Sequence, residues 1–267
     1  MSTEVVLFRK EGSFLSTEKN IGKIILNRPD ALNAINLDLI EGLHKALDQA
    51  EQDKEVKVLV ITAEGQKVFS VGADLKFVST AEQEQVNEFL KKGQELFRRI
   101  EDFPKPVIAA INGLCLGGGL ELSLACDIRI AQEEAKLGAP EVSLGLIPAW
   151  GGTSRLPKIV GMGKAKELIL TGAHISAKEA EKIGLVNKVV PYDELNSTAI
   201  FLGAQIAGNA PLALKEAKLI ANKAFDHPIE EGNKLEFEAV KRLSKTKDLQ
   251  EGIQAVFEKR KARFTGE

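Results

Sequence analysis

Short apolar runs alternate with helical patterns along the first two thirds of the chain, and this alternation constrains the fold more than any other feature. Runs at 22–26, 57–62 and 107–111 contain Val or Ile and are apolar enough to be buried on both faces of a sheet. Between them, residues 39–50 and 89–103 carry apolar side chains at i, i+3 and i+4 spacing, which predicts amphipathic helices. This alternation predicts an α/β fold with mainly parallel crossovers.

The last third of the chain is expected to be almost wholly helical. It follows Pro191, and breaks between helices are predicted at 209–211 and 227–228. Asp248 and Glu251 resemble a capping box that opens the final helix. The apolar stripe of that helix predicts either a core contact or a subunit interface. A length of 267 residues fits one large domain with a helical appendage.

The composition argues against several classes of function. The chain has 36 basic and 38 acidic residues, so its net charge of −2 does not suggest a general nucleic-acid or membrane binder. Cys115 and Cys126 lie in apolar surroundings and are expected to be buried free thiols in a reducing compartment. The three histidines lack the spacing of a metal site. No apolar run approaches the ~20 residues of a membrane helix, and the N-terminal residues lack the core of a signal peptide. We therefore expect a cytoplasmic protein, although a processed organellar enzyme would look the same.

Two glutamates stand in settings that suggest a chemical task. Glu121 follows three consecutive glycines in LCLGGGLELS, and Glu141 follows a proline in LGAPEVS. A carboxylate in an otherwise apolar stretch is costly unless it is used or paired. Two such groups, brought together by the fold, could divide acid and base work between them. The pair points to proton-transfer chemistry on an activated carbonyl compound.

Two glycine-containing segments, at 68–77 and 114–123, precede predicted helices. Glycine lets the backbone approach a ligand closely, and the first amides of a helix have no partner within it. One amide from each segment could therefore point at the same developing oxyanion. The alternative is structural, because three glycines are most often a tight turn or packing point, and Asp74 could simply cap a helix. Neither segment is a nucleotide-binding fingerprint.

Taken together, these segments resemble the enoyl-CoA hydratase (crotonase) superfamily, and the resemblance spans nearly the whole chain. The similar stretches are LNRPDALNAIN at 26–36, VFSVGADL at 68–75, KPVIAAINGLCLGGGLELSLACDIRIA at 105–131, LGAPEVSLGLIPAWGGTSRLPKIVG at 137–161 and FEKRKARF at 257–264. The resemblance implies a spiral of ββα units with the active site over residues 1–195. It also implies a helical C-terminal region over residues 196–267, which builds trimers, often paired into hexamers, and forms part of the coenzyme A site.

The resemblance assigns a site for an acyl-CoA thioester. The backbone amides of Ala73 and Gly118 would form the oxyanion hole. Glu121 and Glu141 fall on the positions of the hydratase acid and base, with Glu121 expected as the base and Glu141 as the proton donor. Further substrate and coenzyme A contacts are expected at Arg28, Ala31, Leu32, Gly72, Asp74, Leu75, Gly117, Pro140, Ala149, Trp150 and Lys259.

Some of these contacts have an ordinary structural alternative. Lys259 belongs to a basic run that would suit either coenzyme A phosphates, reached from a neighbouring subunit, or a solvated helix end. Relatives often carry a basic residue at the position of Asp30, which weakens the case for a phosphate contact there. Trp150 would be either a core aromatic or a wall of the acyl pocket that favours short chains.

The expected activity is that of an enoyl-CoA hydratase. It would add water in the syn sense to a trans-2-enoyl-CoA and give a 3-hydroxyacyl-CoA, with no cofactor beyond the coenzyme A of the substrate. Other crotonase-type reactions remain as alternatives, namely double-bond isomerisation and hydration of a dienoyl or cyclic enoyl thioester. An RNA-binding homologue is an alternative of another class, against which the near-neutral charge argues.

Overall fold

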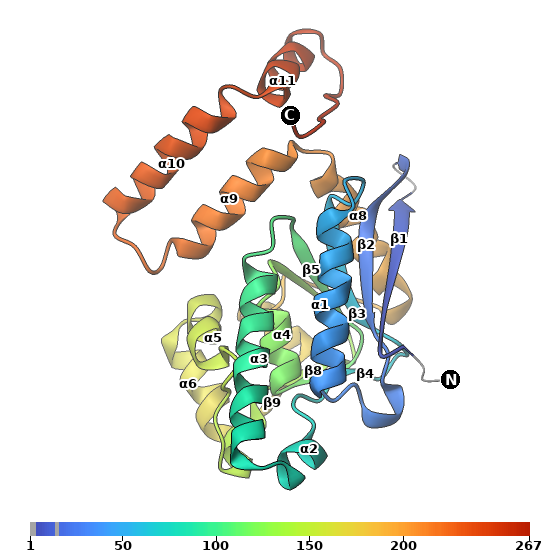
Figure 1. Ribbon diagram of the computed structural model, residues 1–267, viewed down its shortest axis with the longest axis vertical. Helices are drawn as coiled ribbons and strands as arrows, with labels where there is room; N and C mark the ends of the chain where they lie inside the picture. Colours follow the sequence, from blue (N-terminus) through green and yellow to red (C-terminus); the bar gives the residue numbers. More distant parts are fainter. Residues whose placement is uncertain (1–3, 14–15) are drawn as a thin grey trace.

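A larger sheet forms the centre of the molecule (Figure 1). The computed structural model describes residues 4–13 and 16–267. The strands of this sheet are β1 (Val6–Ser13), β2 (Ser16–Leu26), β3 (Val58–Ala63), β5 (Val107–Ile111), β7 (Ile128–Gln132) and β10 (Lys188–Val190). Their order is β1-β2-β3-β5-β7-β10, and only the β1–β2 pair is antiparallel among these neighbours. The three apolar runs of the sequence are therefore strands, as predicted.

A second, smaller sheet places the turns that follow the large strands. It contains β4 (Val68–Ser70), β6 (Leu114–Leu116), β8 (Lys136–Gly138) and β9 (His174–Ser176), in that order. Along the chain, β3 is followed by β4, β5 by β6, and β7 by β8, so each turn adds one strand to each sheet before a helix returns the chain. This repetition is the predicted spiral of ββα units.

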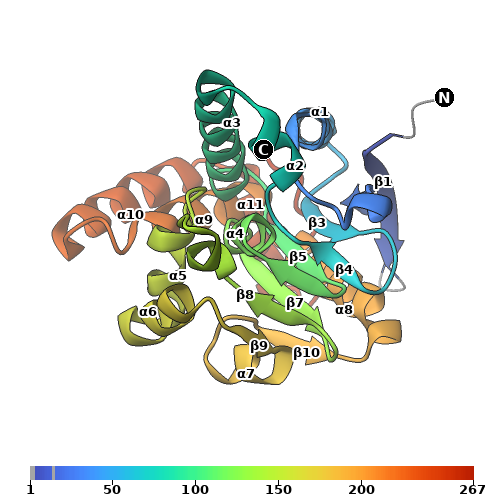
Figure 2. The ribbon, with the colours of Figure 1, turned by 90° about the horizontal axis from the view of Figure 1, so that it is seen from below.

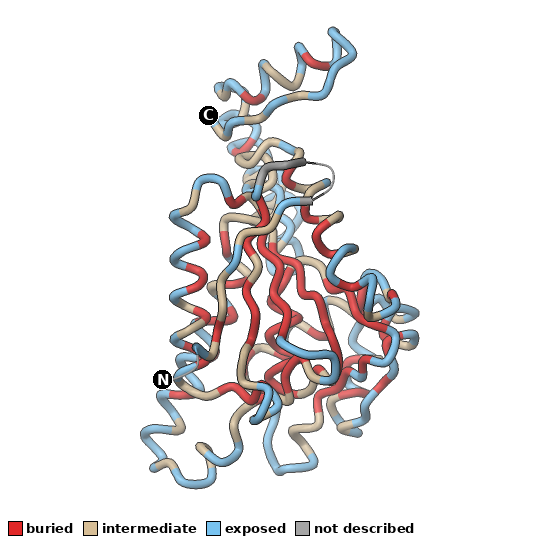
Figure 3. Tube along the Cα trace, turned by 90° about the vertical axis from the view of Figure 1, so that its right-hand side faces the viewer, coloured by how far each residue is buried: buried red, intermediate tan, exposed pale blue. Residues whose placement is uncertain are grey.

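Helices cover both faces of the large sheet (Figure 2). On one side lies α8 (Tyr192–Ala207), which packs against β1, β2, β3, β5 and β7. On the other side lie α1 (Leu37–Gln52) and α3 (Gln83–Glu101), the two helices predicted from apolar spacing. Double coverage explains why β3 and β5 are buried along their whole length, as the buried centre of Figure 3 shows.

Shorter helices connect the strands around the small sheet. They are η1 (Pro29–Ala31), α2 (Leu75–Thr80), α4 (Gly118–Leu124), η2 (Pro140–Leu144), α5 (Gly152–Val160), α6 (Met162–Thr171) and α7 (Ala177–Lys182). Several follow a strand of the small sheet directly, so their first residues gather at one edge of that sheet.

Cys115 and Cys126 are buried free thiols, as predicted, and burial raises the pKa of each to about 12.

Three helices extend away from this body (Figure 1). They are α9 (Pro211–Lys223), α10 (Ile229–Leu243) and α11 (Lys247–Phe257). Lys218 fastens α9 to the body, because its ammonium pairs with Asp127 at 2.9 Å and donates to the carbonyl of Lys105 at 3.2 Å. The predicted boundary after residue 195 falls inside α8, which packs on the sheet, so the helices that leave the body begin with α9.

The start of α11 differs from the sequence prediction. Thr246, not Asp248, caps this helix by accepting a hydrogen bond from the Leu249 amide. Asp248 lies inside the helix, where its carboxylate accepts hydrogen bonds from the amides of Thr265 and Gly266 at 2.8 and 2.9 Å. The acidic side chain therefore holds the C-terminal segment rather than the helix start.

In the part of the chain that the structure describes, no helix combines the length and apolarity needed to span a membrane.

Candidate active site

Glu121 is buried in the first turn of α4 and is held by the backbone of a distant loop. Its Oε1 accepts hydrogen bonds from the amides of Trp150 and Gly152, each at 2.7 Å. Gly152 begins α5, and a Cβ at this position would lie 3.0 Å from Oε1. The approach of the loop to the carboxylate therefore requires a glycine there. No described residue donates to Oε2, so this oxygen is available to a substrate or a water molecule.

Burial brings the protonation equilibrium of Glu121 to neutral pH. Loss of hydration disfavours the carboxylate and raises its pKa to about 7, and the negative charge of Glu141 adds to this increase. The hydrogen bonds from Gly152 and Trp150 act in the opposite direction but are outweighed. A carboxyl group with this pKa can both accept and return a proton near neutral pH.

Glu141 faces the same turn without hydrogen-bond partners. Both of its carboxylate oxygens are buried, and neither is hydrogen-bonded to any described residue. Burial raises the pKa of this carboxyl group. Its Oε1 lies 3.2 Å from the point where a Cβ would stand on Gly117, the first of the three glycines. The structure thus brings the two glutamates predicted from the sequence to one place beside the glycine turn.

The amides of Ala73 and Gly118 lie close together beside the glutamates. Each follows one strand of the small sheet, β4 or β6, and these strands are parallel neighbours. Gly72 has a φ of +97°, and a Cβ on it would lie 2.8 Å from the Gly118 nitrogen. A Cβ on Gly118 would lie 3.4 Å from the Ala73 nitrogen. Glycine is therefore required where the two segments meet.

These two amides have no partner in the described part of the chain, whereas the amides of Gly72, Asp74 and Gly117 beside them do. The Gly72 amide donates to Ser70 Oγ, that of Asp74 to the Ile35 carbonyl, and that of Gly117 to the Gly138 carbonyl. The Gly118 amide opens α4, where a helix leaves its first amides unsatisfied. Two free donors side by side, next to two buried carboxyl groups, form an arrangement that can stabilise an oxyanion.

Trp150 lies between this site and a cavity of about 700 Å³. Its backbone amide donates to Glu121, and the residue lines the cavity together with Ala149 and Ile147. The indole is only 3% exposed and packs edge-on against Phe89 and Phe97, with ring centres 5.0 and 5.5 Å away. Trp150 is therefore a core aromatic, which is one of the two alternatives from the sequence. Glu121, Glu141, Ala73 and Gly118 do not line the cavity that Trp150 borders, so its role as a wall of the acyl pocket stays a prediction.

The remaining predicted contacts fall into three groups. Arg28, Ala31 and Leu32 lie in or beside η1, next to the segment with Gly72, Asp74 and Leu75, and Arg28 pairs with Asp74 at 3.2 Å. Leu32 and Leu75 are about half exposed, at 50% and 49%, and are available to a ligand. Gly117 directly precedes Gly118 in the sequence, and Pro140 directly precedes Glu141.

Lys259 is not brought to the site of its own chain. It follows α11, which lies at the opposite end of the molecule from α2 (Figure 1). The sequence predicted no role for Gly152, because its contact with Glu121 joins residues 31 positions apart. The sequence signal that could have indicated a close backbone contact here is the pair of glycines, Gly151 and Gly152, after Trp150.

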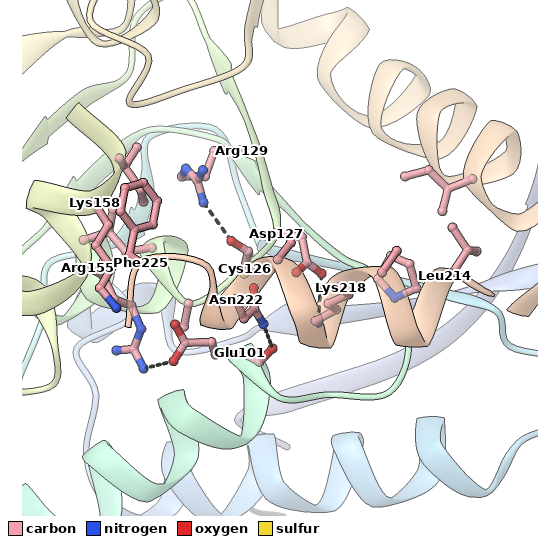
Figure 4. A pocket seen from close by; sticks show the side chains of 17 residues that line it. Glu101, Cys126, Asp127, Arg129, Arg155, Lys158, Leu214, Lys218, Asn222 and Phe225 are labelled. Atoms are coloured by element: carbon pink, nitrogen blue, oxygen red, sulfur yellow. Dashed lines mark hydrogen bonds and ion pairs between the residues drawn. The ribbon is translucent and has the colours of Figure 1, made fainter. Parts of the chain in front are cut away.

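A second cavity, of about 530 Å³, lies between α9 and the body (Figure 4). Its charged groups already have partners: Arg155 pairs with Glu101 at 2.7 Å and Lys218 with Asp127, as Figure 4 shows. Arg129 donates to backbone carbonyls, and Lys158 pairs with Asp226 outside the cavity. Neither catalytic candidate is among its lining residues. These contacts attach α9 and offer no proton-transfer pair. Within residues 4–13 and 16–267, no cluster of three His, Cys, Asp or Glu side chains is arranged to hold a metal ion.

Comparisons with known proteins agree with this architecture. The sequence matches the family described as enoyl-CoA hydratase/isomerase over residues 16–267. A crotonyl-CoA hydratase of Syntrophomonas wolfei is 42% identical over 254 residues, which cover 95% of this chain and 98% of that protein. A short-chain-enoyl-CoA hydratase of Clostridium acetobutylicum is also 42% identical, over 92% of this chain and 95% of that protein.

Solved structures give the same result. The crystal structure of an enoyl-CoA hydratase from Bacillus anthracis matches with a TM-score of 0.93 and 41% identity, covering 98% of this chain and 100% of that one. Sequence and fold therefore agree over almost the full length of both proteins. The chain belongs to the enoyl-CoA hydratase/isomerase family.

Proposed function

We propose that this protein hydrates short-chain trans-2-enoyl-CoA thioesters to 3-hydroxyacyl-CoA. The observation that carries the proposal is the pair of buried glutamates, one with a pKa of about 7, beside two unpaired backbone amides. The names of the two similar hydratases, for crotonyl-CoA and short-chain enoyl-CoA, support the same class of substrate.

The geometry suggests how water would be added. The thioester oxygen would accept hydrogen bonds from the amides of Ala73 and Gly118, each worth about 3 kcal/mol in the transition state. Glu121, in its ionised form, would take a proton from water as the water oxygen bonds to the β-carbon. Glu141, in its protonated form, would deliver a proton to the α-carbon, where the electron pair of the double bond arrives. Because both carboxyl groups lie on the same side of the substrate in this scheme, the addition is syn.

The same arrangement favours hydration over double-bond isomerisation. Moving a double bond needs one group to shuttle a proton, whereas adding water needs a base for water and an acid for carbon. Two buried carboxyl groups with raised pKa values meet the second requirement. The scheme uses backbone donors and carboxyl groups, so coenzyme A enters as part of the substrate and no further cofactor is called for. We also propose a cytoplasmic location, which the similarity to hydratases of two bacteria supports.

Assembly is proposed from the exposed side chains of the helical tail. Phe237 and Val240 on α10, and Val256 and Phe257 at the end of α11, are each more than 60% exposed. Large apolar side chains gathered on one appendage mark an interaction surface. We propose that this surface joins copies of the chain into a trimer or a pair of trimers. Lys259 would then reach the coenzyme A site of a neighbouring subunit.

Replacing either glutamate by glutamine tests the catalytic assignment. Glu121→Gln and Glu141→Gln each remove a proton-transfer group while keeping nearly the same shape, so each should lower kcat for crotonyl-CoA by at least about 100-fold. Binding of a saturated acyl-CoA, measured by calorimetry, should persist in both. In wild type, one oxygen from labelled water should appear at the β-carbon. Near-normal turnover in either variant would rule out the two-carboxylate scheme.

The pH dependence follows from the raised pKa of Glu121. The base must be ionised while Glu141 keeps its proton, so kcat/KM should follow a bell-shaped pH profile, and the ionisation of Glu121 should set one limb of it at about pH 7. An ordinary glutamate would instead be fully ionised well below this point. Initial rates with crotonyl-CoA at constant ionic strength provide the measurement. A rate that does not change between about pH 5.5 and 7.5 would contradict Glu121 as a base with this pKa.

Shortening Trp150 tests the proposed preference for short chains. Trp150→Leu removes bulk between Glu121 and the cavity of about 700 Å³, so the ratio of kcat/KM for an eight-carbon to a four-carbon enoyl-CoA should increase by about tenfold or more. The ratio is the informative quantity, because the substitution also affects absolute rates. If the ratio stays at its wild-type value, Trp150 does not limit chain length.

A charge on the exposed face of α10 should prevent assembly. Phe237→Glu would bury a carboxylate in the proposed interface and should give monomers in analytical ultracentrifugation. Phe237→Leu keeps the position apolar and should remain oligomeric. An unchanged assembly of Phe237→Glu would show that this face of α10 is not the interface.

A further inference from the structure

A slot on α3 receives the indole of Trp150. Phe89, Gly93 and Phe97 are spaced four residues apart and therefore lie along one face of the helix. The two phenylalanine rings flank the indole edge-on, at interplanar angles of 82° and 79°. Gly93 lies between them. A Cβ on Gly93 would collide with the indole Nε1 and Cε2 and lie 2.8 Å from Cδ1.

Space for the indole is the reason for glycine at position 93. The residue lies inside a helix, where glycine is less favourable than alanine, and its φ is outside the left-handed region that requires glycine. The local backbone conformation therefore does not require glycine at this position. The close approach of the Trp150 indole does require it.

The opposite edge of the indole meets the oxyanion segment. A Cβ on Gly118 would lie 2.5 Å from Cζ3 and 2.7 Å from Cε3 of Trp150. The rigid ring system therefore spans the distance from α3 to the first residue of α4, with a glycine at each edge. Displacement at the Gly93 edge has to be taken up at Gly118 or by the backbone of Trp150.

That backbone holds Glu121. The Trp150 amide donates to Glu121 Oε1 at 2.7 Å, and the Trp150 carbonyl accepts from Arg155 Nη1 at 2.9 Å. The preceding carbonyl, of Ala149, accepts from the side chain of Gln94 at 2.8 Å, so the loop is attached to α3 beside Gly93. The indole Nε1 is buried and donates to none of the described residues. Shape, not a hydrogen bond, therefore locates the ring.

We propose that Gly93 is a positioning residue for the reaction: by admitting the Trp150 indole, it sets both the Glu121 carboxylate and the Gly118 amide. The proposal rests on the proposed hydratase function. It adds a residue on α3 that touches no substrate atom and acts through Trp150. A purely structural role of Gly93 would lower stability without changing the catalytic behaviour of the folded protein.

Four variants separate these two roles. Gly93→Ala should displace the indole and lower kcat for crotonyl-CoA by about 100-fold, because a misplacement of about 1 Å can cost this much. Its KM should change little. Trp150→Leu removes the atoms that the new methyl group would meet, so Gly93→Ala combined with Trp150→Leu should be about as active as Trp150→Leu alone. Gly163→Ala is the matched control, since a Cβ on this α6 glycine would have no neighbour within 4 Å.

Two further readouts identify displacement of the site in folded protein. Gly93→Ala should shift the limb of the pH profile that Glu121 sets away from its wild-type midpoint, because the Trp150 amide would no longer hold Glu121 in place. The chain has one tryptophan, so its fluorescence reports on this slot alone. Emission of Gly93→Ala should move to longer wavelength and become easier to quench with acrylamide, while Gly163→Ala should match wild type.

The outcomes are distinct. Wild-type kcat and emission in Gly93→Ala would overturn the proposal, and so would losses that simply multiply in the double variant. If Gly93→Ala fails to fold, recovery of folding and activity in the double variant still supports the fit between the two residues, and failure of the double variant to recover contradicts it. If wild type does not hydrate crotonyl-CoA, the proposed function is wrong, and fluorescence of Gly93→Ala still tests the slot.

Discussion

The arrangement of the site depends on one buried carboxylate held by a loop that is distant in sequence. Glu121 comes from the turn after β6, and the two amides that fix its Oε1 belong to Trp150 and Gly152. Burial raises its pKa to about 7, and the two amides limit the increase. An unpartnered carboxylate in this place would be much more costly. The loop therefore both permits the buried acid and aims its free oxygen.

The spiral of ββα units explains how the other groups arrive at the same place. Each turn of the chain places a strand in the small sheet, so β4 and β6 lie side by side although Ser70 and its partner Cys115 are 45 positions apart in the sequence. The amides of Ala73 and Gly118, which we propose as oxyanion donors, follow these two strands. Glu141 follows β8, the next neighbour in the same sheet. Three consecutive turns of the fold thus contribute the two donors and the two carboxyl groups.

The sequence was sufficient for the strands, the long helices and the pairing of glutamates with glycine turns, because each has a local pattern. Apolar runs predicted β3 and β5, and apolar spacing predicted α1 and α3. Contacts between distant segments carry no such pattern. The capping of α11 by Thr246, the hold of Gly152 on Glu121 and the fit of Trp150 against Gly93 each depend on tertiary packing. The same reason explains why α8, predicted as part of the appendage, belongs to the sheet.

The central claim is that Glu121 is a buried acid that titrates near neutral pH because of its position. The most direct measurement is infrared difference spectroscopy of the carboxyl stretch across a pH series, with Glu121→Gln used to assign the band. The account predicts a band that is lost as the pH rises through about 7 and that is absent from the variant. A Glu121 carboxyl that is fully ionised at pH 5 would contradict the account, because it would place the group in a hydrated rather than a buried environment.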